Sequence, residues 1–256
     1  MAALTDLLPL SLILFACLVT FVSGFVKGAV GFGMPLVMIS GMGIAIEPRL
    51  VVAGIIVPIV LSNGWQVLHA GLGQAWDALR EHWRYVSVVC VMILVSAQFL
   101  VLIPTDVMFV VLGVPVVALC AIQLLGWRPR IAPRWRRWFE WGAGALSGTL
   151  GGLAGTWGPP TVLYLLALET PRARQMAVQG VIYGAGSVML LLGHLRSGVL
   201  NAETLPFSIL LLLPAGLGMW VGFQTGDRLD AARFRRWTLV VLTVAGANLI
   251  RRGLMG

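Results

Sequence analysis

The sequence predicts an all-α integral membrane protein with two inverted repeats of about five helical elements each. Three observations predict this fold. Hydrophobic residues make up 59% of the 256 residues and charged residues only 11%, whereas soluble domains carry about 25% charged residues. Apolar runs of roughly 17–25 residues recur, each long enough to cross a bilayer as a helix. Two interruptions rich in glycine and proline, at 24–35 and 144–160, occupy corresponding places in the two halves.

The apolar segments define the expected elements in chain order. The first half contains 8–26, 30–46, 50–68, 85–103 and 107–125, and the second contains 139–154, 158–168, 175–194, 205–225 and 237–250. Residues 8–46 are too long for one span, so a break near 28–33 divides them. The same reasoning divides 139–168 at 155–160. Because the segments after the breaks are short, each repeat is expected to start with a broken or re-entrant helix.

The two halves match element by element. Gly28 and Gly148 align, 120 residues apart, and each break is followed by an acidic residue, a proline and an arginine, at 47–49 and 169–172. Proline suits the first turn of the following helix, where its missing N–H would be unpaired anyway. We therefore expect a first membrane repeat at 1–126, a basic cytoplasmic linker at 127–138 and a second membrane repeat at 139–256.

The distribution of arginines predicts the orientation. With the N-terminus outside, five elements per repeat place 13 arginines in inside loops and four in outside loops, with Lys27 uncounted. An eight-span arrangement with an inside N-terminus gives only 10 to 7. Since cytoplasmic loops are enriched in Lys and Arg, the five-plus-five inverted arrangement is favoured. Residues 1–8 lack the basic region of a signal peptide, so the first segment is expected to be retained.

Other classes of function find little support in the sequence. The net charge of +8 and the basic run at 127–138 fit a membrane-facing loop with interfacial tryptophans, so we expect contact with the lipid bilayer and no nucleic acid. The cysteines and histidines lack disulfide or metal-ligand spacing, and no phosphate loop or nucleophile–base set is visible. We therefore expect no enzyme activity, no cofactor and no metal ion. A homo-oligomer is compatible with the sequence.

The two breaks predict an anion site. Backbone interrupted inside a membrane persists only where protein or a wet cavity satisfies it, and restarting helices present N–H groups and positive dipole ends to anions. All ten Asp and Glu lie at segment ends or in loops, whereas a cation site normally shows a deep carboxylate. The candidate substrate-binding residues are Lys27, Gly28, Gly31, Gly33, Asn63, Gln66, Ser147, Gly148, Thr149, Gly155, Thr156, Gly158, Pro159, Gln179 and Tyr183.

Each part of this site has an alternative interpretation. Gly24 and Gly28, and likewise the glycines at 144, 148 and 152, have the spacing that lets membrane helices touch. Lys27 could instead reach the inner interface with its long side chain. The polar residues of 63–66 and 179–183 could serve hydrogen bonds between helices.

The two breaks, Gly28-Ala-Val-Gly-Phe-Gly33 with Pro35 and Gly148-Thr-Leu-Gly-Gly152 with Gly155-Thr-Trp-Gly-Pro-Pro160, resemble those of the sulfite exporter TauE/SafE family of bacterial membrane permeases. The segment at 163–168 and Pro171 also fit the second half of that family. The resemblance implies a multi-pass protein of the bacterial inner membrane that exports sulfite or small organosulfonates such as sulfoacetate. The expected mechanism is secondary transport by alternating access. An anion channel, or a carrier of another small organic anion, is the alternative.

Overall fold

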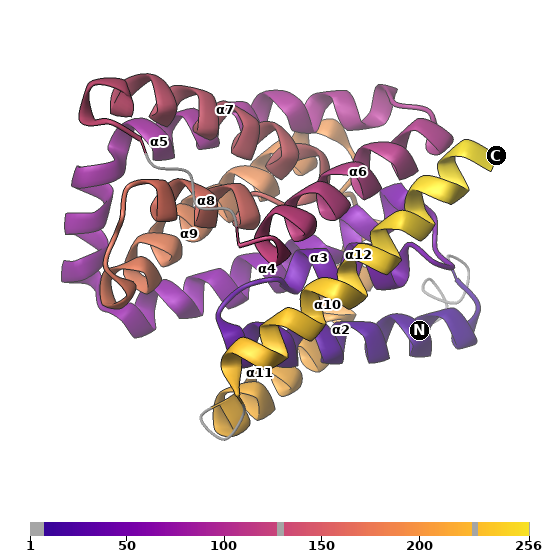
Figure 1. Ribbon diagram of the computed structural model, residues 1–256. Coiled ribbons are helices and arrows are strands. Elements are labelled where there is room, and N and C mark those ends of the chain that lie inside the picture. The colour runs from indigo at the N-terminus through magenta and orange to yellow at the C-terminus, as the bar shows by residue number, and fades with distance from the viewer. Residues whose placement is uncertain (1–7, 127–130, 227–229, 256) are drawn as a thin grey trace.

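A computed structural model describes residues 8–126, 131–226 and 230–255, and the regular structure within these ranges is helical (Figure 1). The first half contains α2 (Leu10–Val30), α3 (Met34–Met42), α4 (Pro48–Ala70), α5 (Leu72–Phe99), the 3-10 turn η1 (Leu100–Leu102) and α6 (Thr105–Leu124). The second half contains η2 (Pro133–Trp135), α7 (Arg136–Ala154), α8 (Gly158–Ala167), α9 (Arg172–Ser197), α10 (Leu205–Leu210), α11 (Leu212–Gly226) and α12 (Ala231–Met255). Residues 127–130 of the expected linker, and Arg228, lie outside the described residues.

Within the described ranges, seven helical segments are long and apolar enough to cross a membrane. They are α2, α4, α5 with η1, α6, α9, α10 with α11, and α12. The predicted all-helical, multi-pass membrane protein is confirmed. Helices α3 and α8, with 9 and 10 residues, reach only about 15 Å at 1.5 Å per residue. They are the two elements that follow the breaks, as the segment lengths predict.

Two element boundaries differ most from the sequence expectation. Helix α5 begins at Leu72 rather than near residue 85, because residues 72–84 form a charged helical stretch that a search for apolar runs passes over. The backbone of His82 is non-helical there (φ −106°, ψ 18°), so the helix bends between this stretch and the apolar span. The expected segment 205–225 is divided at Leu211. Pro214 has no N–H to donate to the carbonyl of Leu210, which interrupts the helical ladder.

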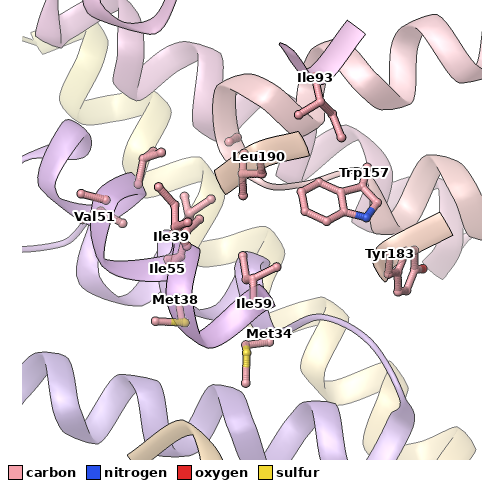
Figure 2. Close-up of a cluster of buried hydrophobic side chains, with 14 of the residues drawn as sticks. Met34, Met38, Ile39, Val51, Ile55, Ile59, Ile93, Trp157, Tyr183 and Leu190 are labelled. Carbon is pink, nitrogen blue, oxygen red and sulfur yellow. The ribbon is translucent and has the colours of Figure 1, made fainter. Parts of the chain in front are cut away.

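The buried core extends from α3 to α9 and passes both breaks. Figure 2 shows Met34, Met38 and Ile39 of α3 beside Ile55 and Ile59 of α4, with Trp157 and Tyr183 toward the other end of the same cluster. These side chains are almost completely buried. The residues before α8 therefore pack into the same core as the start of α3.

Three helix pairs approach each other through glycine, and one of them is α6 with α12, where a Cβ at Gly113 would overlap the carbonyl oxygen of Gly246. A Cβ at Gly28 would overlap the carbonyl oxygen of Met219, and one at Gly218 would overlap the carbonyl oxygen of Phe21, so α2 and α11 touch backbone to backbone. Helix α7 approaches α5 in the same way, since a Cβ at Gly152 would overlap the carbonyl oxygen of Ile93. These contacts are the small-residue packing that the glycine spacing allows.

Polar contacts join chain connections at the two ends of the bundle. At one end, Glu81 of α5 lies 2.7 Å from Arg174 of α9 and 3.9 Å from Arg136 of α7, and Arg136 pairs with the buried Glu140 at 3.0 Å. We call this group, completed by Arg84 at 3.6 Å from Glu140, the arginine–glutamate cluster. The cluster joins residues at or near the starts of α5, α7 and α9, which the arginine distribution predicts on the cytoplasmic side.

At the other end, Arg49 donates to the carbonyls of Val101 and Ile103, both at 3.0 Å. Arg252 donates to the carbonyl of Gly43. These contacts join connections that the sequence places outside. In Figure 1 both marked chain ends lie toward the right, and the starts of α7 and α9 lie at the left.

Candidate functional site

Glycines end the two helices that precede the breaks. Gly31 (φ 82°) and Gly33 (φ 94°) follow α2, and Gly155 (φ 63°) follows α7. All three occupy the left-handed region, which glycine enters without the strain that a Cβ causes. The N–H of Gly31 bonds to the carbonyl of Lys27 at 2.8 Å, which closes α2 one turn after the lysine. The local sequence thus places Lys27 in the last turn of α2, directly beside the break.

A small cavity of about 30 Å³ lies between the two breaks. Its walls come from the end of α2, both breaks, α4 and α9. The lining residues are Lys27, Phe32, Gly33, Pro35, Leu36, Asn63, Gly155, Thr156, Trp157, Gly158, Pro159 and Tyr183. Since one water needs about 10–15 Å³ by this measure, the cavity is narrow in this conformation and admits only a compact group.

Lys27 is the only charged residue that lines the cavity among the described residues. Its side chain is 6% exposed, and its ammonium donates to Ser62 Oγ at 3.0 Å and to Asn63 Oδ1. Asn63 in turn donates from Nδ2 to the carbonyl of Tyr183 at 3.1 Å, which links α4 to α9. The Lys27 ammonium is therefore buried within the protein, against polar groups of α4.

Within the described ranges of the chain, Lys27 has no oppositely charged partner. No carboxylate of the described residues forms an ion pair with Lys27, and its two hydrogen-bond partners are neutral. A buried charge without a counter-ion costs several kcal/mol in the protein interior. A bound anion would supply the missing charge.

Hydroxyl groups of α5, α7 and α8 form hydrogen bonds that hold the second break in place. The carbonyl of Trp157 accepts hydrogen bonds from Ser147 Oγ at 3.0 Å and from Thr161 Oγ1 at 2.7 Å. Thr161 Oγ1 lies 3.0 Å from the hydroxyl of Tyr85, so α8 is tied to both α7 and α5. Tyr183 donates to the carbonyl of Gly158 at 3.2 Å from the α9 side. These contacts orient the start of α8 toward the cavity.

The backbone supplies few N–H donors at the restarting helices. Pro35 occupies the first turn of α3, and Pro159 and Pro160 occupy that of α8. Because proline has no N–H, Gly158 is the one donor among the first three residues of α8. Side-chain donors, above all Lys27, therefore carry more of an anion's coordination than the helix starts alone predict.

The structure brings together eight of the candidate residues at the cavity. They are Lys27, Gly33, Asn63, Gly155, Thr156, Gly158, Pro159 and Tyr183. The other seven lie elsewhere in the described structure. They are Gly28, Gly31, Gln66, Ser147, Gly148, Thr149 and Gln179.

The positions of these outlying residues have physical reasons. Gly28 faces the backbone of α11 and Gly148 faces that of α5, so both lie in helix contacts. Ser147 bonds to the carbonyl of Trp157, behind the cavity wall. Both polar atoms of the Gln66 side chain are buried without a hydrogen-bond partner in the part of the chain that the structure describes, and Gln66 Cγ approaches Gly180 of α9.

Sequence reasoning missed Ser62 and Trp157. Ser62 contacts the Lys27 ammonium, and its place next to Asn63 was the available signal. Trp157 is 2% exposed and lines the cavity. A tryptophan between glycines carries no clear polar signal, so its role depends on the tertiary structure.

Comparison with known proteins identifies the family to which this chain belongs. The family model described as sulfite exporter TauE/SafE matches residues 16–249, which include both breaks and all the cavity residues. No curated protein and no solved structure matches the chain. The match extends from α2 through α12, so it takes in both halves of the fold. This chain therefore belongs to the sulfite exporter TauE/SafE family and is a membrane transporter, not an enzyme.

Proposed function

We propose that the chain is a secondary carrier that exports a small sulfur oxyanion or organosulfonate, and that the anion binds beside Lys27 between the two breaks. The uncompensated charge of Lys27 in the cavity is the observation that carries this proposal. An anion seated there would neutralise the ammonium and also meet the hydroxyl of Thr156 and the positive end of α8. The family membership supports sulfur-containing anions as the class.

The proposal includes an inverted arrangement of two repeats, residues 1–126 and 139–256. The helix contacts support it, because the most extensive contacts of one half have counterparts in the other. Helix α2 packs on α11 as α7 packs on α5, while α4 packs on α9 and α6 on α12. Such a pairing is expected when two related halves with opposite orientation surround a site near the midplane.

Alternating access would then move the two sides of the cavity apart. Hydroxyl contacts join α8 to α5 and α7, whereas Lys27 belongs to α2, which packs on α11. A rocking motion of α5, α7 and α8 against α2 and α11 would open the cavity between the two breaks, which we call the Lys27 cavity, to one side of the membrane at a time. We place the protein in the bacterial inner membrane, where an ion gradient or the substrate's own gradient would drive export.

Transport by the purified protein in liposomes tests the proposal. Labelled sulfite, taurine, isethionate and sulfate are offered with and without gradients of pH or sodium. We expect saturable movement of at least one sulfur anion. If none of these anions moves, the assignment is refuted. If the protein shows single-channel conductance in planar bilayers, it is an anion channel and not a carrier.

Charge variants test the proposed site within the same assay. Lys27→Gln should reduce transport by at least about tenfold, because it removes the one charge that faces the anion. Lys27→Arg should keep part of the activity. Arg196→Gln is the matched control, since it removes one positive charge from an exposed position and should transport normally. Normal transport by a folded Lys27→Gln protein would show that the anion binds elsewhere.

A further inference from the structure

The Lys27 cavity contains one amine, and the protonated form of this amine supplies one unit of positive charge. The other lining residues in the described structure are glycines, prolines, Phe32, Leu36, Asn63, and three residues with a hydroxyl or indole group. The nearest partners of the ammonium, Ser62 and Asn63, are neutral. Lys27 is therefore the one cationic side chain of the described lining that can balance the charge of a bound ligand.

A singly charged anion would make this site neutral, and a doubly charged anion would not. With a monoanion beside Lys27, the buried region carries no net charge. A dianion leaves one negative charge in an interior where an uncompensated ion costs several kcal/mol. A zwitterion leaves the ammonium charge itself uncompensated.

Among the described residues, no second cationic side chain lines the cavity to compensate a second negative charge. The oxygen of Asn63 already accepts from Lys27, and the carbonyl of Gly158 accepts from Tyr183, so both present negative ends near the cavity. The arginines of the arginine–glutamate cluster are paired with Glu81 and Glu140. That cluster lies near Tyr164, whose hydroxyl is 2.8 Å from Nδ1 of His82, the neighbour of Glu81. Tyr164 is seven residues beyond Trp157, the residue before α8, which is about 10 Å along the helix.

We propose that the Lys27 cavity selects singly charged sulfur anions over doubly charged and zwitterionic ones. This inference rests on the proposed function and narrows it. Hydrogen sulfite and monosulfonates fit the charge of the site, whereas sulfate, the sulfite dianion and sulfoacetate each bring one charge too many. The site selects anions by charge as well as by size, because the Lys27 ammonium balances one negative charge on the ligand.

Substrate pairs of fixed charge and similar size test the inference in proteoliposomes. Methanesulfonate and sulfate both place four substituents on sulfur, but they carry one and two negative charges. Isethionate, taurine and sulfoacetate share a two-carbon sulfonate skeleton and carry one, no net and two negative charges. We expect methanesulfonate to be transported at least about tenfold better than sulfate, and isethionate at least about tenfold better than taurine or sulfoacetate.

Variants that change the charge of the cavity separate this effect from the hydration of sulfate. Phe32→Lys adds a second ammonium at a half-buried lining position, and Thr156→Lys adds one on the opposite break. Either should raise sulfate transport relative to methanesulfonate by about tenfold or more, whereas Lys27→Gln should reduce transport of both. Size-exclusion profiles in detergent show which variants are folded, and the second lysine variant serves if the first does not fold.

The outcomes separate the two proposals. Transport of sulfur anions with equal rates for methanesulfonate and sulfate would overturn the charge selection and leave the proposed function standing. An unchanged preference in a folded Phe32→Lys or Thr156→Lys protein would also overturn it. Failure to move any sulfur anion would overturn both proposals. The expected order in the unmodified protein, together with its shift in a lysine variant, would support the selection.

Discussion

At the residue scale, the proposed anion site depends on the position of one side chain. Lys27 lies in the last turn of α2 because Gly31 ends the helix there. The same break turns the chain so that Ser62 and Asn63 of α4 accept from its ammonium. A lysine with only neutral partners and a cavity beside it is arranged to attract an anion.

Asn63→Asp should abolish anion transport without unfolding the protein. The substitution keeps the size of the side chain but gives Lys27 a permanent carboxylate partner, which competes with the substrate for the ammonium. Liposome transport should fall by at least about tenfold, while the thermal midpoint in detergent should not fall by more than a few degrees.

Ser62→Ala is the matched comparison for Asn63→Asp. It removes one of the two hydrogen bonds to Lys27 and leaves the charge uncompensated. We expect Ser62→Ala to retain most of its transport. Full activity of Asn63→Asp would show that the charge of Lys27 does not face the substrate.

At the element scale, the two short helices differ from the long ones in what fixes them. The long pair α2 and α11 approaches through glycine, without room for a side chain. Helix α8 is fixed by hydroxyl groups, because Thr161 contacts both the Trp157 carbonyl and Tyr85. Close packing through glycine therefore determines how the long helices α2 and α11 are placed, and hydrogen bonds determine where α8 begins.

Gly218→Ala should destabilise the protein and Gly216→Ala should not. A Cβ at Gly218 overlaps the carbonyl oxygen of Phe21, and forcing α11 away from α2 should cost about 1–3 kcal/mol. Gly216, on the same helix, has open space around its Cβ position. Alanine there should raise stability slightly by reducing chain entropy. Thermal unfolding in detergent compares the two, and equal midpoints would contradict the close contact.

Thr161→Val and Tyr85→Phe should show coupled effects on stability. Each removes one side of the 3.0 Å hydroxyl contact that joins α8 to α5. A double-mutant cycle by unfolding in mixed micelles should give a coupling of about 0.6–1.7 kcal/mol, the range for hydrogen bonds between membrane helices. Strictly additive effects would mean that the contact does not form.

At the scale of the whole molecule, polar contacts gather the connections at two opposite ends. The arginine–glutamate cluster joins α5, α7 and α9 at one end, and Arg49 and Arg252 bind backbone carbonyls at the other. From the positive-inside rule, we expect the end with more arginine to face the cytoplasm. Helices α3 and α8 would then lead from the cavity toward opposite sides.

Single cysteines at Ala132 and Asn201 should be labelled from opposite sides of the membrane. Both positions are exposed, in the connection before α7 and in that between α9 and α10. A membrane-impermeant maleimide should reach Asn201→Cys in intact spheroplasts and Ala132→Cys only in inverted vesicles. The background protein has Cys17, Cys90 and Cys120 replaced by serine or alanine and serves as the control. Labelling of both positions from one side would refute the five-plus-five topology.

The sequence predicted most of the fold from properties that are local along the chain. The apolar runs gave the helices, and the glycines and prolines of 24–35 and 144–160 gave the places where they are interrupted. The starts of α5 and α11 were not predicted. A charged helical stretch such as 72–84 does not register as an apolar run, and a single Pro214 inside a span shows no other boundary signal.

The candidate site was predicted in part for the same reason. Break residues such as Lys27, Gly155 and Gly158 were found because they lie at the interruptions themselves. Gly28 and Gly148 also belong to the glycine-rich breaks, and for this reason they were predicted as site residues. In the structure they face α11 and α5 instead of the cavity.

By itself, the sequence determined that this protein is a helical membrane protein with a positive charge beside the first of two breaks, because hydropathy and charge are properties of individual residues. The tertiary structure decided that both breaks line one cavity and that Lys27 faces neutral groups within it. Contacts between Lys27, Asn63 and Tyr183 join residues 36 and 120 positions apart. Such contacts arise from the packing of α2, α4 and α9, which no local pattern in the chain encodes.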